Sequence, residues 1–99
     1  MANFDNISGF DWDKGNARKN EQHGVSQSEA EEVFFNEPFV LDQDTLHSEK
    51  ESRWHALGQT SSGRRLLHIT FTLRSSNTLI RIISARDMSR KERSYYEEA

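Results

Sequence analysis

Five arginine and histidine side chains in the second half of the chain are spaced so that one side of a β-sheet would carry them all. They are Arg53, His55, Arg64, His68 and Arg81. Arginine binds phosphate oxygens through two hydrogen bonds, stays charged and can stabilise a pentavalent transition state. Histidine titrates near neutral pH and can act as a general acid or base. The set therefore suits chemistry at a phosphate group.

Three segments with alternating apolar residues position this set. They cover residues 53–58, 65–73 and 79–86, with the turn signals TSSG and SSNT between them. Successive side chains of a strand point to opposite faces of its sheet. We therefore expect one face of the middle strand to be buried. Its apolar residues are Leu67, Ile69, Phe71 and Leu73.

The hairpin register follows if each turn has two residues, 61–62 and 76–77. The buried face then pairs Ile69 with Trp54, Leu67 with Ala56, Phe71 with Ile82 and Leu73 with Ile80. The other face pairs His68 with His55, Thr70 with Arg53 and Thr72 with Arg81, and it also carries Arg64. A slip of one residue would bury an arginine, which is costly.

Two interpretations of this polar face remain open. An antiparallel sheet often has one solvated face, on which arginine and threonine are common. The alternative is a functional surface, because these strands carry no carboxylate on that side. Glu49 and Glu51 stand just before the first strand.

Helices are expected to cover the apolar face. Ser26 and Glu29 predict a capping box at the start of SQSEAEEVFFNEP, and Pro38 ends that helix. Asp13 can N-cap a weaker helix that stops near Gly24.

The remaining elements complete an α+β pattern. FDWD at 10–13 suggests a short strand or an extended segment, and FVLD at 39–42 predicts a strand. Ser89 can N-cap a final helix with Glu92 at its third position. We expect a flexible segment at 1–9 and a single domain at 10–99.

Composition excludes several classes of protein. The chain has 99 residues, no Cys and an apolar fraction of 33%, so a Cys-based metal site and disulfides are excluded. No apolar run is long enough to span a membrane, and MANFDNISGF does not resemble a signal peptide. A cytoplasmic protein is the expectation.

The two parts of the chain carry opposite net charge. Residues 1–60 hold 5 Lys and Arg against 12 Asp and Glu, whereas 61–99 hold 8 against 4. The basic half suggests an anionic partner, although the two halves can also neutralise each other.

The polar set fits two kinds of phosphate chemistry. RNA cleavage by its own 2′-hydroxyl needs a base, an acid and charge stabilisation, with Glu49 or His55 as base. Simple binding of RNA or phosphate fits equally well. The histidine spacing matches neither H-E-x-x-H nor H-x-x-E-H, so no metal site or cofactor is expected.

Four stretches together resemble the BrnT family of bacterial type II toxins. They are FDWDKGNARKNEQHGVSQSEAEEVFF, HSEKESRW, SSGRRLLHITFTLR and IRIISARDMSRKERSYYEEA, in the family's order over roughly residues 10–99. The resemblance implies a RelE-like α+β fold and a metal-independent ribonuclease that halts translation. It also implies neutralisation by a BrnA antitoxin, in a heterotetramer or larger complex. The family's recurring polar residues fall on His47, Glu49, Arg53, Arg64, Arg81, Arg86 and Arg90.

The resemblance and the pairing together assign roles. Arg64 and Arg81 would bind the scissile phosphate, with Glu49 or His55 as general base and a histidine or arginine as acid. Arg53, Arg86 and His68 would bind flanking RNA. The last helix would dock the partner through Arg90, Arg93 and Tyr96. A non-catalytic module of the same fold, such as a gyrase poison or an inactive toxin, is the alternative.

Overall fold

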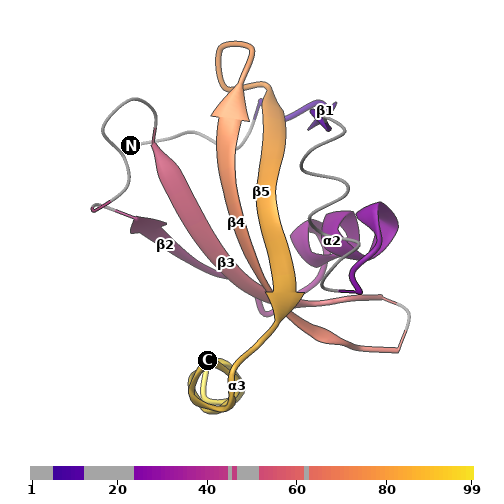
Figure 1. Ribbon diagram of the computed structural model, residues 1–99, viewed down its shortest axis with the longest axis vertical. Coiled ribbons are helices and arrows are strands. Elements are labelled where there is room, and N and C mark those ends of the chain that lie inside the picture. The colour runs from indigo at the N-terminus through magenta and orange to yellow at the C-terminus, as the bar shows by residue number, and fades with distance from the viewer. Residues whose placement is uncertain (1–5, 13–23, 45, 47–51, 62) are drawn as a thin grey trace.

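The alternating segments form the middle of a five-stranded sheet with strand order β1-β5-β4-β3-β2 (Figure 1). The structure, a computed structural model, describes residues 6–12, 24–44, 46, 52–61 and 63–99. The strands are β1 (Gly9–Phe10), β2 (Val40–Asp44), β3 (Arg53–Gln59), β4 (Leu66–Arg74) and β5 (Leu79–Asp87). The helices within these residues are α2 (Gln27–Glu32), the 3-10 helix η1 (Val33–Phe35) and α3 (Arg90–Glu97). The predicted α+β class is confirmed.

The sheet is mixed because its first strand runs parallel to β5, whereas the other neighbouring strands are antiparallel. The backbone N–H of Ser8 donates to the Thr78 carbonyl at 2.8 Å, and Ile7 packs against the core. The chain therefore joins the sheet within the segment expected to be flexible, of which residues 1–5 lie outside the described part.

Local capping chemistry fixes where both α-helices begin. The Ser26 hydroxyl accepts from the Glu29 N–H at 3.1 Å, and the Ser26 N–H donates to the Glu29 carboxylate at 3.0 Å. Ser89 and Glu92 make the same two contacts at the start of α3, at 3.1 and 2.9 Å. Both predicted capping boxes are confirmed. The weaker helix predicted after Asp13 falls on residues that the structure does not describe.

The apolar face of the sheet forms the core together with α2 and η1. Leu67, Ile69 and Phe71 of β4 are fully buried, as the alternation predicted. The other buried apolar residues of this cluster are Val25, Ala30, Val33, Trp54, Ala56, Ile80, Ile82 and Ala85. The ring of Phe34 packs edge-on against Phe71, with centroids 5.1 Å apart.

The β3–β4 hairpin differs from the predicted register by two residues. Trp54 pairs with Phe71 and Ala56 with Ile69, so each β3 residue meets a β4 partner two positions later than expected. The reason is the turn between Thr60 and Arg65: the Thr60 N–H donates to the Arg65 carbonyl at 2.9 Å, and Gly63 and Arg64 have left-handed backbone (φ 81° and 49°). A shift of two residues keeps every side chain on its predicted face.

The β4–β5 hairpin keeps the predicted register near its turn. Phe71 pairs with Ile82 and Leu73 with Ile80, as expected, although the loop spans the four residues 75–78 rather than two. A β-bulge follows at Thr70/Phe71, and beyond it each β5 partner is one position later than predicted.

Candidate functional site

Polar side chains form cross-strand rows on the face of the sheet opposite the core, which we call the polar face. One row joins Asp44, Arg53, Thr72 and Arg81 across four strands. The next joins Asp42, His55, Thr70 and Ser84, and the third joins Val40, Leu57, His68 and Arg86. Directly opposite residues of antiparallel strands share a face, so the predicted residues Arg53, His55, His68 and Arg81 lie on the polar face.

The bulge in β5 brings Arg86 onto this face. Strict alternation from Ile80 and Ile82 would point residue 86 into the core. The extra residue reverses this parity, so Ala85 is buried beside Ile69 and Arg86 lies beside His68. The register predicted from the sequence contained no β-bulge.

A line of hydrogen bonds crosses the centre of the polar face. His55 Nε2 lies 2.9 Å from Asp44 Oδ2, and His55 Nδ1 lies 2.9 Å from His68 Nε2. His68 Nδ1 in turn lies 2.7 Å from Glu92 Oε2 of α3. The two imidazoles are therefore linked in series between two carboxylates, and we call these four residues the histidine relay.

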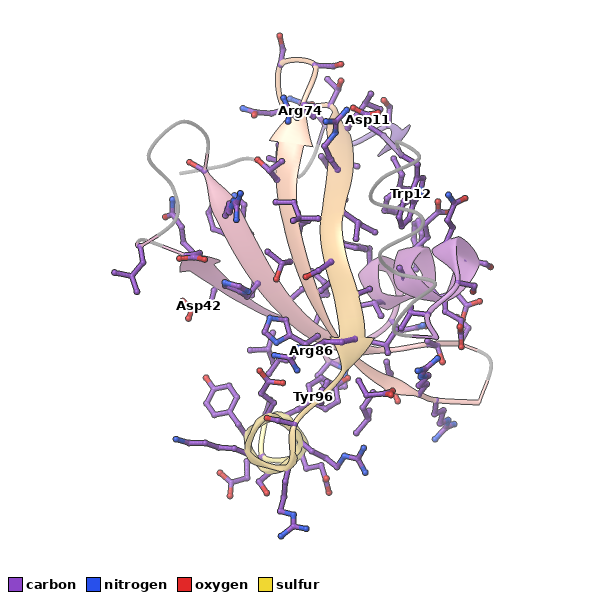
Figure 2. The ribbon with its side chains drawn as sticks, viewed as in Figure 1. Asp11, Trp12, Asp42, Arg74, Arg86 and Tyr96 are labelled. Atoms are coloured by element: carbon purple, nitrogen blue, oxygen red, sulfur yellow. The ribbon has the colours of Figure 1, made fainter. Side chains whose placement is uncertain are left out.

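Glu92 is held at the end of the histidine relay by Arg86. The guanidinium donates from Nη1 to Oε1 at 2.9 Å and from Nη2 to Oε2 at 3.1 Å. Burial alone would raise the pKa of Glu92, but hydrogen bonds from Arg86, the Ser89 backbone and His68 outweigh it and lower the pKa to about 2. Glu92 is therefore an anion at neutral pH. Figure 2 shows Arg86 reaching toward α3 from the end of β5.

Counting ring hydrogens shows how the contacts of the two histidines depend on each other. The contacts to Asp44, between the rings and to Glu92 need three ring hydrogens, whereas two neutral imidazoles carry two. All three contacts are satisfied only when the two rings together carry three hydrogens. Burial lowers the pKa of His68; the Glu92 carboxylate opposes this effect, and Arg86 and His55 add to it. When His68 Nδ1 carries no hydrogen, Arg86 Nη2 can donate to it at 2.8 Å.

A pocket of about 430 Å³ opens beside the histidine relay, between β2, β3 and α3. Its lining mixes apolar and ionisable side chains. The lining residues are Val40, Leu41, Asp42, His55, Leu57, His68, Glu92 and Tyr95. The His55 side chain is 33% exposed and that of His68 is 13% exposed, so His55 is the relay's outer ring.

Arg81 lies in the first row, and a neighbouring carboxylate compensates its positive charge. Its Nη2 donates to Asp11 Oδ2 at 2.9 Å and its Nε to the same oxygen at 3.3 Å. Asp11 follows β1, near the opposite end of the sheet from α3 (Figure 2). The polar face therefore has one arginine–carboxylate pair near each end, with the histidines between them.

Arg64 lies outside the cross-strand rows because it precedes β4, and its role at the scissile phosphate stays a prediction. It has a positive φ of 49° and is exposed in the β3–β4 turn. Its neighbour Arg65 binds the Gly24 carbonyl at 2.7 Å and Asp87 Oδ1 at 2.7 Å, which ties the turn to the start of the α2 region. The alternation argument extended the strand two residues too far.

The remaining predicted site residues divide by exposure. Glu49 lies outside the described residues, so its role stays a prediction. Arg90 and Arg93 are exposed on α3. Tyr96 is buried and its hydroxyl donates to the Pro38 carbonyl at 2.7 Å, so it anchors α3 and is not a surface contact for a partner. Its neighbour Tyr95 is 63% exposed.

Sequence reasoning missed the two carboxylates of the histidine relay. The predicted strand at 39–42 stopped before Asp44, whereas β2 extends to it and pairs it with Arg53. Continuing the alternation from Asp42 would have placed it on the polar face. Glu92 was recognised only as a helix cap, and no local signal indicated that it also reaches His68.

The histidine relay is linear, so its donors do not converge on one point. Within the described ranges, no group of three or more His, Cys, Asp or Glu side chains is arranged to hold a metal ion. Nor does this part of the chain contain a helix that is long and apolar enough to cross a membrane.

The comparison with protein families gave one informative match. Residues 12–92 match the model of a family described as the ribonuclease toxin, BrnT, of a type II toxin-antitoxin system. The match covers all the described strands except β1 and extends into α3. The comparison with curated proteins gave no match.

Proposed function

The chain belongs to the BrnT family of ribonuclease toxins, and from that premise we propose that it cleaves RNA without a metal ion, on the polar face of a RelE-like fold. The observation that carries the proposal is the direct contact of two imidazoles among arginines: His55 Nδ1 lies 2.9 Å from His68 Nε2 on the face that also carries Arg81. Histidine side chains as a class can act as general acid or base near neutral pH. Arginines on both sides supply positive charge for a phosphate.

The reaction is attack by the RNA 2′-hydroxyl on the adjacent phosphorus. The base is Nε2 of the outer ring, His55. In the reactive neutral pair His55 Nδ1–H donates to His68 Nε2 and His68 Nδ1–H donates to Glu92, so His55 Nε2 can take the 2′-hydroxyl proton. The O2′–P bond forms, the P–O5′ bond breaks, and a proton from water completes the 5′-hydroxyl. The hydroxide that remains takes the proton from the histidine pair, which restores the neutral base. The products are a 2′,3′-cyclic phosphate and a 5′-hydroxyl end. Arg81 and Arg86 stabilise the added negative charge at phosphorus, and Arg53 holds a flanking phosphate.

The type II family implies an antitoxin as partner as well as an RNA substrate. We assign the partner to a BrnA-like protein that forms a heterotetramer or larger complex with the toxin. The exposed arginines of α3, Arg90 and Arg93, form a basic surface on which an acidic antitoxin segment can dock. Cleavage of cellular RNA would halt translation until the antitoxin binds.

Purified toxin tests the proposal directly. We expect it to cut a 5′-labelled RNA in the presence of EDTA and to leave 5′-hydroxyl ends that a kinase can label. His55→Gln should slow cleavage about 100-fold or more, which is the usual contribution of a positioned acid or base. Gln43→Asn is the control, because Gln43 is exposed and paired with Trp54 rather than with a polar-face residue.

Two outcomes would contradict the proposal. Loss of all activity in EDTA with recovery on adding Mg²⁺ would refute the metal-free mechanism. Intact RNA with broken DNA after expression of the toxin alone would favour the gyrase-poison alternative.

A further inference from the structure

The pocket beside the histidine relay has an apolar floor although it opens on the polar face. Val40 and Leu57 pair directly with each other on that face and both line the pocket. They occupy the row next to Asp42 and His55. Apolar side chains at this position leave flat surface for an aromatic or aliphatic group, whereas phosphates bind to the neighbouring arginines.

The wall of the pocket is an exposed aromatic ring. Glu92 and Tyr95 are three residues apart on α3, so they project from the same side of the helix toward the sheet. Tyr96 already fixes the helix through its buried ring and its bond to Pro38. Packing of α3 therefore does not require Tyr95, whose ring stays 63% exposed.

The rim of the pocket carries an exposed carboxylate. Asp42 is exposed and pairs across the strands with His55. Asp44, two residues later, binds His55 Nε2. Among the residues that the structure describes, no hydrogen-bond donor or cation contacts the Asp42 carboxylate. Figure 2 shows Asp42 on β2, directed away from the strands.

We propose that this pocket binds a guanine base of the RNA. The base stacks on Tyr95 over the floor of Val40 and Leu57, and its Watson–Crick edge donates to Asp42. Guanine is the RNA base that presents two adjacent donors on this edge, N1–H and the 2-amino group, which match the two oxygens of a carboxylate. Adenine and cytosine present one amino group and uracil one imino group. Stacking on aromatic side chains with hydrogen bonds to base edges is how proteins read single-stranded RNA.

The proposal rests on the proposed ribonuclease function, because it takes RNA as the ligand. His55, His68 and Glu92 line the same pocket, so the bound base belongs to a nucleotide that adjoins the scissile phosphate. The toxin should therefore cut beside guanosine, with Asp42 as the residue that determines specificity.

Oligonucleotides that differ in one base test this specificity. The substrates are uridine-rich RNAs with a single guanosine, inosine or adenosine. Wild-type toxin should cleave the guanosine RNA about 10- to 100-fold faster than the adenosine RNA, since a bidentate contact gives discrimination of this order. Inosine, which lacks the 2-amino group, should fall between them. Asp42→Asn should abolish the preference, and Tyr95→Leu should raise KM for every substrate.

Glu97→Gln is the matched control, because it removes one exposed carboxylate of α3 outside the pocket. It should leave the preference for guanosine unchanged. If Asp42→Asn cleaves with unaltered base preference, the proposal is wrong while the ribonuclease function stands. If Asp42→Asn changes only neutralisation by the antitoxin, the pocket belongs to that protein and the proposal is equally overturned.

A binding measurement decides the matter without catalysis. Titration with guanosine 5′-monophosphate and adenosine 5′-monophosphate, followed by NMR of the backbone amides, separates base from phosphate because both nucleotides carry the same phosphate. We expect tighter binding of the guanine nucleotide, with shifts at β2 and α3 that disappear in Asp42→Asn. This result with no RNA cleavage would support the base pocket and refute the ribonuclease function. Equal affinity for both nucleotides would refute the base pocket.

Discussion

Replacing Glu92 by Gln removes one negative charge from the histidine relay and little else. Glutamine keeps the size of the side chain and can still accept from the Ser89 N–H, so the capping box survives. It cannot form the two charged hydrogen bonds with Arg86 or compensate a protonated His68. The substitution therefore isolates the electrostatic contribution of the carboxylate.

The magnitude follows from the pKa of Glu92. A carboxyl whose pKa falls from 4.5 to about 2 on folding contributes about 3 kcal/mol at neutral pH. The side chain is 24% exposed, and solvent screening reduces this to about 2 kcal/mol. Since the folded pKa is the lower one, the unfolded chain takes up the proton first as the pH falls. The contribution is complete above about pH 5 and is lost between 4.5 and about 2.

Urea unfolding at pH 7 and at about pH 3, followed by tryptophan fluorescence, measures this contribution. Glu92→Gln should be about 2 kcal/mol less stable than the parent at pH 7 and much closer to it at pH 3. Glu97→Gln is the control on the same helix and should change stability by less than about 0.5 kcal/mol. A Glu92→Gln protein that is as stable as the parent at pH 7, or that loses stability on acidification as steeply, would refute the reasoning.

Three further substitutions test other parts of the fold. Gly58→Ala would place a Cβ 2.5 Å from Val33 Cγ1, so it should lower the stability of the fold by about 1–3 kcal/mol. Thermal unfolding measures this loss, and an unchanged midpoint would contradict the close approach of β3 to η1. Ser89→Ala removes the cap of α3 and should cost about 1 kcal/mol with a loss of helical circular dichroism; an unaltered spectrum and stability would argue against this cap. His68→Gln should flatten the fall in stability that begins as the pH drops through 6.5. Burial lowers the pKa of His68 below 6.5, so the unfolded chain protonates first, and an equally steep fall in the variant would show that other groups are responsible.

Local signals explain which parts of the fold were predictable from the sequence. The hydroxyls of Ser26 and Ser89 and the carboxylates three residues later are enough to start both helices. The apolar alternation around Phe71 fixes the face of each strand, because a strand in the wrong register would bury charge. These interactions lie within a few residues or within one strand pair, so they can be read from the printed sequence.

The arrangement of the site depends on contacts that local patterns do not encode. The left-handed backbone at Gly63 and Arg64 moves the first turn, and this leaves Arg64 in the turn rather than in β4. The β-bulge that brings Arg86 onto that face is a property of two paired strands rather than of either alone. The position of Glu92 depends on how α3 folds back over the sheet. The pattern of residue types predicted the arginines and histidines of the polar face. Their acidic partners, Asp11, Asp44 and Glu92, could be identified only from the tertiary structure.

Those acidic partners change how the polar face can bind RNA. Arg81 is bonded to Asp11 and Arg86 to Glu92, so a phosphate near either guanidinium must compete with a carboxylate already in place. Such competition weakens binding of any polyanion, because part of the favourable charge interaction is already made within the protein. Under the proposed function, Arg81 and Arg86 would therefore act mainly on the extra charge of the transition state, and the proposed base pocket of Asp42 and Tyr95 would add binding of the substrate. The same compensation would favour docking of the proposed antitoxin on the exposed cations of α3 rather than on these two arginines.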